Sequence, residues 1–243
     1  MSIFAHIRAI GLVVAAMTAP CAVSAKDLTV FAAASLRGAL DEIAGLSADN
    51  ITLSYAGSGL IARQVSQGAP ADVVVLAHPI WMDWLTEKDL LIAGTRTDVA
   101  ANTLAVIAPA PSPDQDLNQI LKTNRIAMGQ RDAVPAGIYA KQWLETTGLW
   151  ADIEANVIET DDVRLALALV ARGDVPVGIT YRSDALSDPR VRIMHDINPT
   201  THSPIRYPAA AITDEGRAFM MVLTSPHAQD IFRSHGFAPL VQD

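Results

Sequence analysis

Four stretches of the sequence place backbone N–H groups and hydroxyls where an anion could bind. Each lies where an apolar segment ends and an amphipathic one begins, at 34–36, 57–59, 134–137 and 161–163. The first turn of a helix has N–H groups without partners inside the helix, and the helix dipole makes that end partly positive. Such a terminus can bind an oxyanion without any charged side chain.

Two of these junctions carry a serine that can add a hydroxyl to the main-chain donors. Ser35 and Ser58 are predicted to be N-cap residues, and the hydroxyl of each can also donate to an oxyanion. A plain helix cap explains each serine equally well, and spacing alone does not show that the junctions converge.

The other two junctions offer main-chain donors only. Pro135 suits the first position of a helix, which leaves the N–H of Ala136 free of the helix ladder. The carboxylates of Asp161 and Asp162 would repel an anion. The helix that follows them can therefore contribute only through the N–H of Val163, with both acids turned aside.

Enzymatic and metal chemistry lack their usual partners in this sequence. The segment 57–62 fits a dinucleotide-binding pattern, but the next apolar segment does not end in an acid that could hold a ribose. Ser58 lacks the glycines two residues to either side that a nucleophile elbow requires. No histidines or carboxylates have the spacing of metal ligands. We expect neither a catalytic residue nor a cofactor, and an exported hydrolase using Ser58 or Asp72 remains the alternative.

The elements that must position these groups alternate between short apolar and amphipathic segments. Strands are predicted at 27–33, 51–55, 72–77, 103–108, 125–128, 156–159, 177–181, 191–194 and 206–212. Helices are predicted at 35–47, 59–67, 79–88, 136–147, 162–172, 214–224 and 226–234. This alternation predicts an α/β protein with largely parallel sheets. The proline-rich segment 109–116 indicates a loop or an inter-domain connection.

Composition and the N-terminus restrict the location and the partners. Residues 1–25 have a weakly basic start, an apolar run and a small-residue end, which is typical of a secretory signal peptide cleaved after Ala25. A membrane anchor, or a lipid on Cys21, remains an alternative. Cys21 is the single cysteine, so the mature chain has no disulfide. The net charge of −8 argues against a nucleic-acid partner.

Motifs along residues 28–237 resemble one family, the periplasmic molybdate-binding components of ABC transporters. The segments that carry the resemblance are FAAASL (31–36), GAPAD (68–72), WMD (81–83), VPAGIYAK (134–141), DDVRLALALV (161–170), GITYRSDA (178–185) and SHGF (234–237). The resemblance implies the type II periplasmic-binding-protein fold, in which two α/β lobes are joined by two crossover strands and close on a ligand in the cleft between them. The first lobe would comprise 26–103 plus 209–243, and the second 104–208.

The resemblance also implies a site and a ligand. The oxyanion would be held by Ser35, Ser58 and Tyr181 and by the main chain of Ala136 and Val163, with no direct ligand to the metal. We expect the ligand to be molybdate or tungstate, captured outside the cytoplasm by a monomer and passed to the membrane permease of an ABC importer. Sulfate or thiosulfate binding, or use of the same fold as a ligand sensor, remain alternatives.

Overall fold

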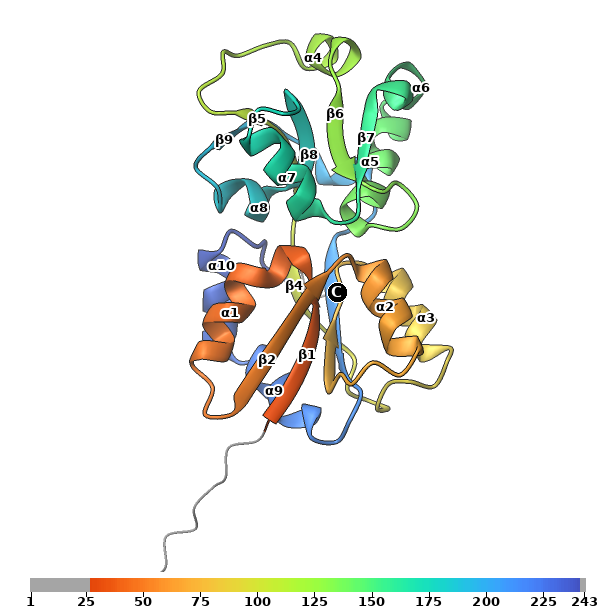
Figure 1. The fold of residues 1–243 in the computed structure, drawn as a ribbon, viewed down its shortest axis with the longest axis vertical. Coiled ribbons are helices and arrows are strands. Elements are labelled where there is room, and N and C mark those ends of the chain that lie inside the picture. The colour runs from red at the N-terminus through yellow and green to blue at the C-terminus, as the bar shows by residue number, and fades with distance from the viewer. Residues whose placement is uncertain (1–26, 241–243) are drawn as a thin grey trace, which may run out of the picture.

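The protein has two α/β lobes, each built around a five-stranded sheet (Figure 1). A computed structural model describes residues 27–240. In the first lobe the sheet has the order β2-β1-β3-β10-β4, with β1 (Asp27–Ala33), β2 (Asn50–Ala56), β3 (Val73–Val75), β4 (Thr97–Ala101) and β10 (Arg206–Ala211). In the second lobe the order is β7-β6-β8-β5-β9, with β5 (Leu104–Pro109), β6 (Ile126–Gly129), β7 (Val157–Thr160), β8 (Val177–Tyr181) and β9 (Val191–Asp196).

Helices cover both faces of the first sheet, with α1 and α10 on one side and α2 and α3 on the other (Figure 1). The helical elements of this lobe are η1 (Ala34–Leu36), α1 (Arg37–Gly45), α2 (Ser58–Ser66), α3 (Pro79–Thr86), α9 (Gly216–Leu223) and α10 (Pro226–Ser234). Because both faces are covered, strand β3 consists of three fully buried valines rather than an alternating pattern.

The second lobe has the same layered construction. Its helical elements are α4 (Leu117–Thr123), α5 (Pro135–Thr146), α6 (Trp150–Ile153), η2 (Glu154–Asn156), α7 (Val163–Ala171) and α8 (Arg182–Leu186), and η3 (Pro199–Thr201) lies on the connection back to the first lobe. Within residues 27–240 no helix is long and apolar enough to cross a bilayer.

Each sheet is mixed rather than largely parallel, which corrects the prediction from sequence. In the first sheet β1 pairs in parallel with β2 and β3, whereas β10 is antiparallel to β3 and β4. The second sheet repeats this pattern, with β6 parallel to β7 and β8, and β5 antiparallel to β8 and β9. The reason is the connectivity: β5 and β10 each enter a lobe from the other lobe and therefore run against the strands that end at the cleft.

The chain passes between the sheets twice, at 102–103 after β4 and at 197–205 after β9. The lobe boundaries at 103/104 and 208/209 stay a prediction, and β10 pairs with first-lobe strands from Arg206 onward. The proline-rich segment 109–116 is a loop within the second lobe, between β5 and α4, and not an inter-domain connection. The predicted signal peptide lies outside the described residues.

Candidate ligand-binding site

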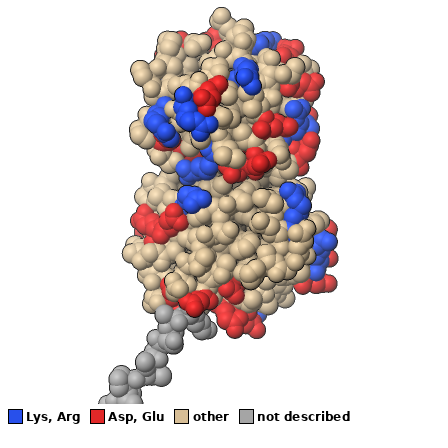
Figure 2. Space-filling view, in the orientation of Figure 1, with Lys and Arg blue, Asp and Glu red and all other residues tan. Residues whose placement is uncertain are grey.

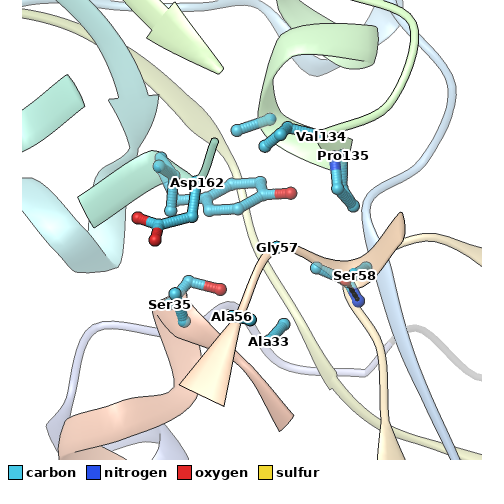
Figure 3. Close-up of a pocket in the computed structure, with 13 residues that line it drawn as sticks. Ala33, Ser35, Ala56, Gly57, Ser58, Val134, Pro135 and Asp162 are labelled. Atoms are coloured by element: carbon cyan, nitrogen blue, oxygen red, sulfur yellow. Dashed lines mark hydrogen bonds between the residues drawn. The ribbon is translucent and has the colours of Figure 1, made fainter. Parts of the chain in front are cut away.

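All five residues predicted to bind an oxyanion line one pocket between the lobes (Figure 3). The pocket is lined by small or apolar residues apart from two serines, one tyrosine and one aspartate; the full set is Ala33, Ala34, Ser35, Ala56, Gly57, Ser58, Ala77, Val134, Pro135, Ala136, Asp162, Val163 and Tyr181. The pocket is narrow, with room for about one water molecule in this arrangement of the lobes.

The strand ends explain why these residues meet. Strands β1, β2 and β3 are parallel, so their carboxyl ends lie at one edge of the first sheet, facing the cleft. Strands β6, β7 and β8 do the same in the second lobe. Ligands of open α/β sheets bind outside the carboxyl ends of the strands, and here two such edges face each other.

Ser35 and Ser58 come from the first lobe, and neither is an N-cap as the sequence predicted. The caps are Ala33 and Gly57, without any side-chain capping bond. The Ser58 hydroxyl oxygen instead accepts a hydrogen bond from the N–H of Ala77, at 3.0 Å. A main-chain N–H can only donate, so the Ser58 hydrogen is left to donate to a ligand.

Ala136 and Val163 come from the second lobe, at the starts of α5 and α7. Pro135 is the first residue of α5, as predicted, and Ala136 is the second. Val163 is the first residue of α7. N–H groups at these positions have no partner within their own helix, so they are available to an anion between the lobes.

The two acids before α7 are engaged elsewhere. The Asp162 carboxylate caps α7 by accepting from the N–H of Leu165 at 2.9 Å, and it points away from Pro135 and Ser58 (Figure 3). The Asp161 carboxylate accepts from the side-chain amide of Gln130 at 2.9 Å. Each carboxylate thus has a hydrogen-bond partner outside the ligand position, although Asp162 forms part of the pocket wall.

Tyr181 ends strand β8 and brings the one phenol of the pocket. Its side chain is 1% exposed, and its hydroxyl has no hydrogen-bond partner within the part of the chain that the structure describes. Burial raises the pKa of Tyr181 well above its ordinary value. The Tyr181 hydroxyl is thus a neutral donor that is free to bond a ligand. Buried hydroxyls without a partner are rare in folded proteins, and a ligand in the pocket would explain this one.

An ion pair between α7 and α8, of which only the carboxylate is buried, was not singled out from the sequence. Asp184, in the first turn of α8, is 0% exposed, and its carboxylate lies 2.7 Å from the guanidinium of Arg164 on α7. The contact is an ion pair without good hydrogen-bond geometry. Burial raises the pKa of Asp184 to about 7, with Asp162 adding to the rise and Arg164 opposing it.

Three further buried polar residues were also missed: Asn102, Ser183 and Tyr207. Asn102 donates hydrogen bonds to Ser183 and to Tyr207, and the Tyr207 hydroxyl is hydrogen-bonded to that of Ser35. Asn102 lies between the sheets, Tyr207 in a strand and Ser183 in a short helix, so no capping or periodicity signal marks them in the sequence. They become visible only when the two lobes are placed together.

The pocket supplies hydrogen-bond donors, and the two residues considered for hydrolysis, Ser58 and Asp72, are bonded to other groups. Ser58 is paired with a main-chain N–H rather than with a base. Asp72 accepts from the N–H of Thr29 and from the hydroxyl of Thr213, at 2.8 and 2.7 Å, and so holds first-lobe segments together. Among residues 27–240 no group of three or more His, Cys, Asp or Glu could hold a metal ion.

Two α/β lobes with a small donor-lined pocket between them define a solute-binding protein of the two-lobed class. A model of the bacterial extracellular solute-binding protein family matches residues 28–238. The chain is 37% identical over 226 residues to the molybdate-binding protein ModA of Escherichia coli, covering 86% of this chain and 88% of that protein. It is 35% identical over 243 residues to ModA of Haemophilus influenzae, covering 93% and 95%.

The fold agrees with this similarity. The periplasmic molybdate-binding protein of Azotobacter vinelandii superposes with a TM-score of 0.78 at 21% identity, covering 88% of this chain and 100% of that one. The chain belongs to the ModA family of bacterial extracellular solute-binding proteins. This family consists of binding proteins, not enzymes.

Proposed function

We propose that this protein captures molybdate between its lobes and delivers it to an ABC importer. The observation that carries the proposal is the composition of the pocket. Its hydrogen-bond donors come from both lobes and are neutral, and among the described residues that line it there is no Lys, Arg or His; its one charged residue, Asp162, caps α7. The curated relatives described above are named for the same ligand.

Five residues would hold the anion. Ser35 and Ser58 would donate from their hydroxyls and main-chain N–H groups, Ala136 and Val163 from their N–H groups, and Tyr181 from its phenol. All five line the same pocket. Neutral donors at helix starts can stabilise a dianion, because oriented N–H dipoles supply the partial positive charge that side chains do not.

A site whose hydrogen-bond donors are all neutral favours a particular kind of anion. Molybdate is fully deprotonated at neutral pH, so it accepts hydrogen bonds and donates none. Phosphate keeps a proton, and its O–H group would need an acceptor. The one carboxylate in the pocket wall, Asp162, already accepts from the N–H of Leu165, which disfavours phosphate binding. Tungstate has the same charge and shape as molybdate and is expected to bind too. Sulfate is smaller, so its exclusion depends on the size of the closed pocket.

The cellular setting follows from the same proposal. Residues 1–25 would direct export, and the mature monomer would work in the periplasm and dock transiently on the membrane permease of the importer. Lys and Arg side chains are interspersed with Asp and Glu over the face in Figure 2 rather than gathered into a basic surface. This distribution and the net charge of −8 fit a protein without a nucleic-acid partner.

Calorimetric titration of the mature protein with molybdate, tungstate and sulfate tests the proposal. We expect saturable 1:1 binding of molybdate and tungstate, and no measurable heat from sulfate at the same concentrations. Sulfate binding as tight as that of molybdate would overturn the assignment of the ligand, and absence of any oxyanion binding would overturn the function.

A further inference from the structure

A chain of buried hydrogen bonds leads from the connection between the lobes to the Ser35 hydroxyl. The Ser35 oxygen lies 3.2 Å from the hydroxyl of Tyr207 on β10, and that hydroxyl lies 3.1 Å from the amide nitrogen of Asn102. The three side chains are at most 6% exposed. Water therefore does not compete for these bonds, and the direction of each is set by the groups themselves.

The direction of the chain is fixed at its Asn102 end. The side-chain oxygen of Asn102 accepts from the N–H of Thr103 at 2.9 Å, and a main-chain N–H can only donate. The amide nitrogen therefore faces the other way. Its two hydrogens are used by the Tyr207 hydroxyl and by the hydroxyl of Ser183, which lies 2.8 Å away.

The remaining hydrogens follow in order. The Tyr207 oxygen accepts from Asn102, so its own hydrogen is directed to the oxygen of Ser35. The Ser35 hydrogen is then left for the pocket that Ser35 lines. In the reverse order the buried Tyr207 hydrogen could turn only toward the neighbouring Tyr181 hydroxyl, with which it makes no hydrogen bond of good geometry in the described structure, and this is unfavourable.

We propose that Asn102 and Tyr207 are positioning residues that hold the Ser35 hydroxyl as a one-way donor to the bound anion. The inference rests on the proposed function, since it assumes that Ser35 contacts the ligand. It explains why the two serines need different support: Ser58 is oriented directly by the N–H of Ala77, whereas Ser35 has no such main-chain neighbour in the described structure and is oriented through Tyr207.

The same Asn102 amide also bonds to the segment of the second lobe that carries Tyr181. Ser183, which accepts its other hydrogen, lies two residues after Tyr181 at the start of α8. One amide between the lobes is thus bonded to the residue behind Ser35 and to the helix that follows Tyr181. Ser35 and Tyr207 both belong to the first lobe, so of these bonds only the one to Ser183 is expected to depend on how the lobes are arranged.

The test is a double-mutant cycle on molybdate affinity, measured by calorimetry. Tyr207→Phe is expected to weaken binding by roughly 3- to 10-fold, the usual value of one neutral hydrogen bond. In a Ser35→Ala background the same change should have almost no effect, because the hydroxyl that it orients is gone. Tyr139→Phe, at a buried phenol that does not line the pocket, is the matched control and should bind like the wild type.

An equal loss from Tyr207→Phe in both backgrounds, or no loss at all, would overturn the relay while leaving molybdate binding by the wild type intact. Failure of the wild type to bind molybdate would instead overturn the proposed function on which the relay rests.

A second variant keeps the test decisive if Tyr207→Phe does not fold. Asn102→Asp keeps the shape and the acceptor for Thr103 but can only accept at its other oxygen. The Tyr207 hydrogen would turn toward it, and the Ser35 hydrogen would turn away from the pocket. We expect a loss of affinity larger than that of Tyr207→Phe, most of which disappears in the Ser35→Ala background. An undiminished loss in that background, or wild-type affinity, would overturn the proposal.

Discussion

At the scale of single residues, each side-chain donor of the pocket differs in how its hydrogen is directed. Ser58 is set by a main-chain N–H, Ser35 by the Tyr207 phenol, and Tyr181 has a buried hydroxyl with no partner in the described structure. A buried hydroxyl without a hydrogen-bond partner destabilises the unliganded protein, so a ligand that accepts from Tyr181 removes this cost. Tyr181 is the residue whose removal should affect binding with the least effect on folding.

Tyr181→Phe is accordingly expected to fold normally and to weaken molybdate binding by roughly 1–3 kcal/mol, the cost of leaving a polar partner unmet. Calorimetry measures the affinity, and thermal unfolding of the unliganded protein checks the fold. Unchanged affinity would contradict the assignment of Tyr181 as a ligand-binding residue.

The five candidate residues could be named from sequence because each lies at a junction with a motif of its own or in a segment that resembles the family. Their supporting residues could not. The roles of Asn102 and Tyr207 depend on distances across two lobes, and those distances are set by tertiary packing rather than by neighbours in the chain.

At the scale of elements, the starts of η1, α2, α5 and α7 form the site, and the pair α7–α8 supports it from behind. The partly exposed Arg164 of α7 and the buried Asp184 of α8 form an ion pair. Removing the Arg164 charge is expected to be destabilising, since the Asp184 carboxylate that it faces stays buried. The loss of stability in such a variant combines several effects. The change of unfolding free energy with pH, in contrast, reports on the protonation of Asp184 itself.

The pKa of Asp184 is about 7 in the folded protein and near 3.9 in an unfolded chain. Between these values the folded state holds a proton that the unfolded state has lost, so the contribution of Asp184 is largest below about pH 4 and is lost as pH rises to 7. Relative to Asp184→Asn, the wild type should lose at least about 1 kcal/mol of unfolding free energy from pH 5 to 7. Urea titrations of both proteins at pH 5, 6 and 7 measure this difference, and parallel curves would contradict it.

Most elements of the fold were predictable from alternating apolar and amphipathic segments, since buried strands such as β3 and β8 are apolar throughout. Strand β4 was missed because only Val99 and Ala100 in it are buried. The short helices α4, α6 and α8 were missed as well, because elements of one or two turns show no clear period. The antiparallel strands were not foreseen because they result from how the chain passes between lobes.

At the scale of the whole molecule, ligand binding joins the two lobes. In the structure they already approach closely: a Cβ atom on Gly57 of the first lobe would clash with the carbonyl oxygen of Asp161 in the second. An anion held by both sides adds bonds across this contact and none in the unfolded chain. Binding should therefore stabilise the entire protein by mass action.

Molybdate at about 100 times its dissociation constant should add about 2.7 kcal/mol and raise the melting temperature by roughly 5–10 °C. Differential scanning calorimetry measures the shift, with sulfate at the same concentration as the control. A melting temperature that molybdate leaves unchanged would contradict binding in the folded cleft.

The most direct test of the central claim locates the molybdenum atom itself. Crystals grown with molybdate, measured at the molybdenum absorption edge, should give one anomalous peak between the lobes, with oxygen atoms within hydrogen-bond distance of Ser35, Ser58, Ala136, Val163 and Tyr181. A peak outside this pocket, or one in contact with Lys, Arg or His side chains, would contradict a dianion site made of neutral donors.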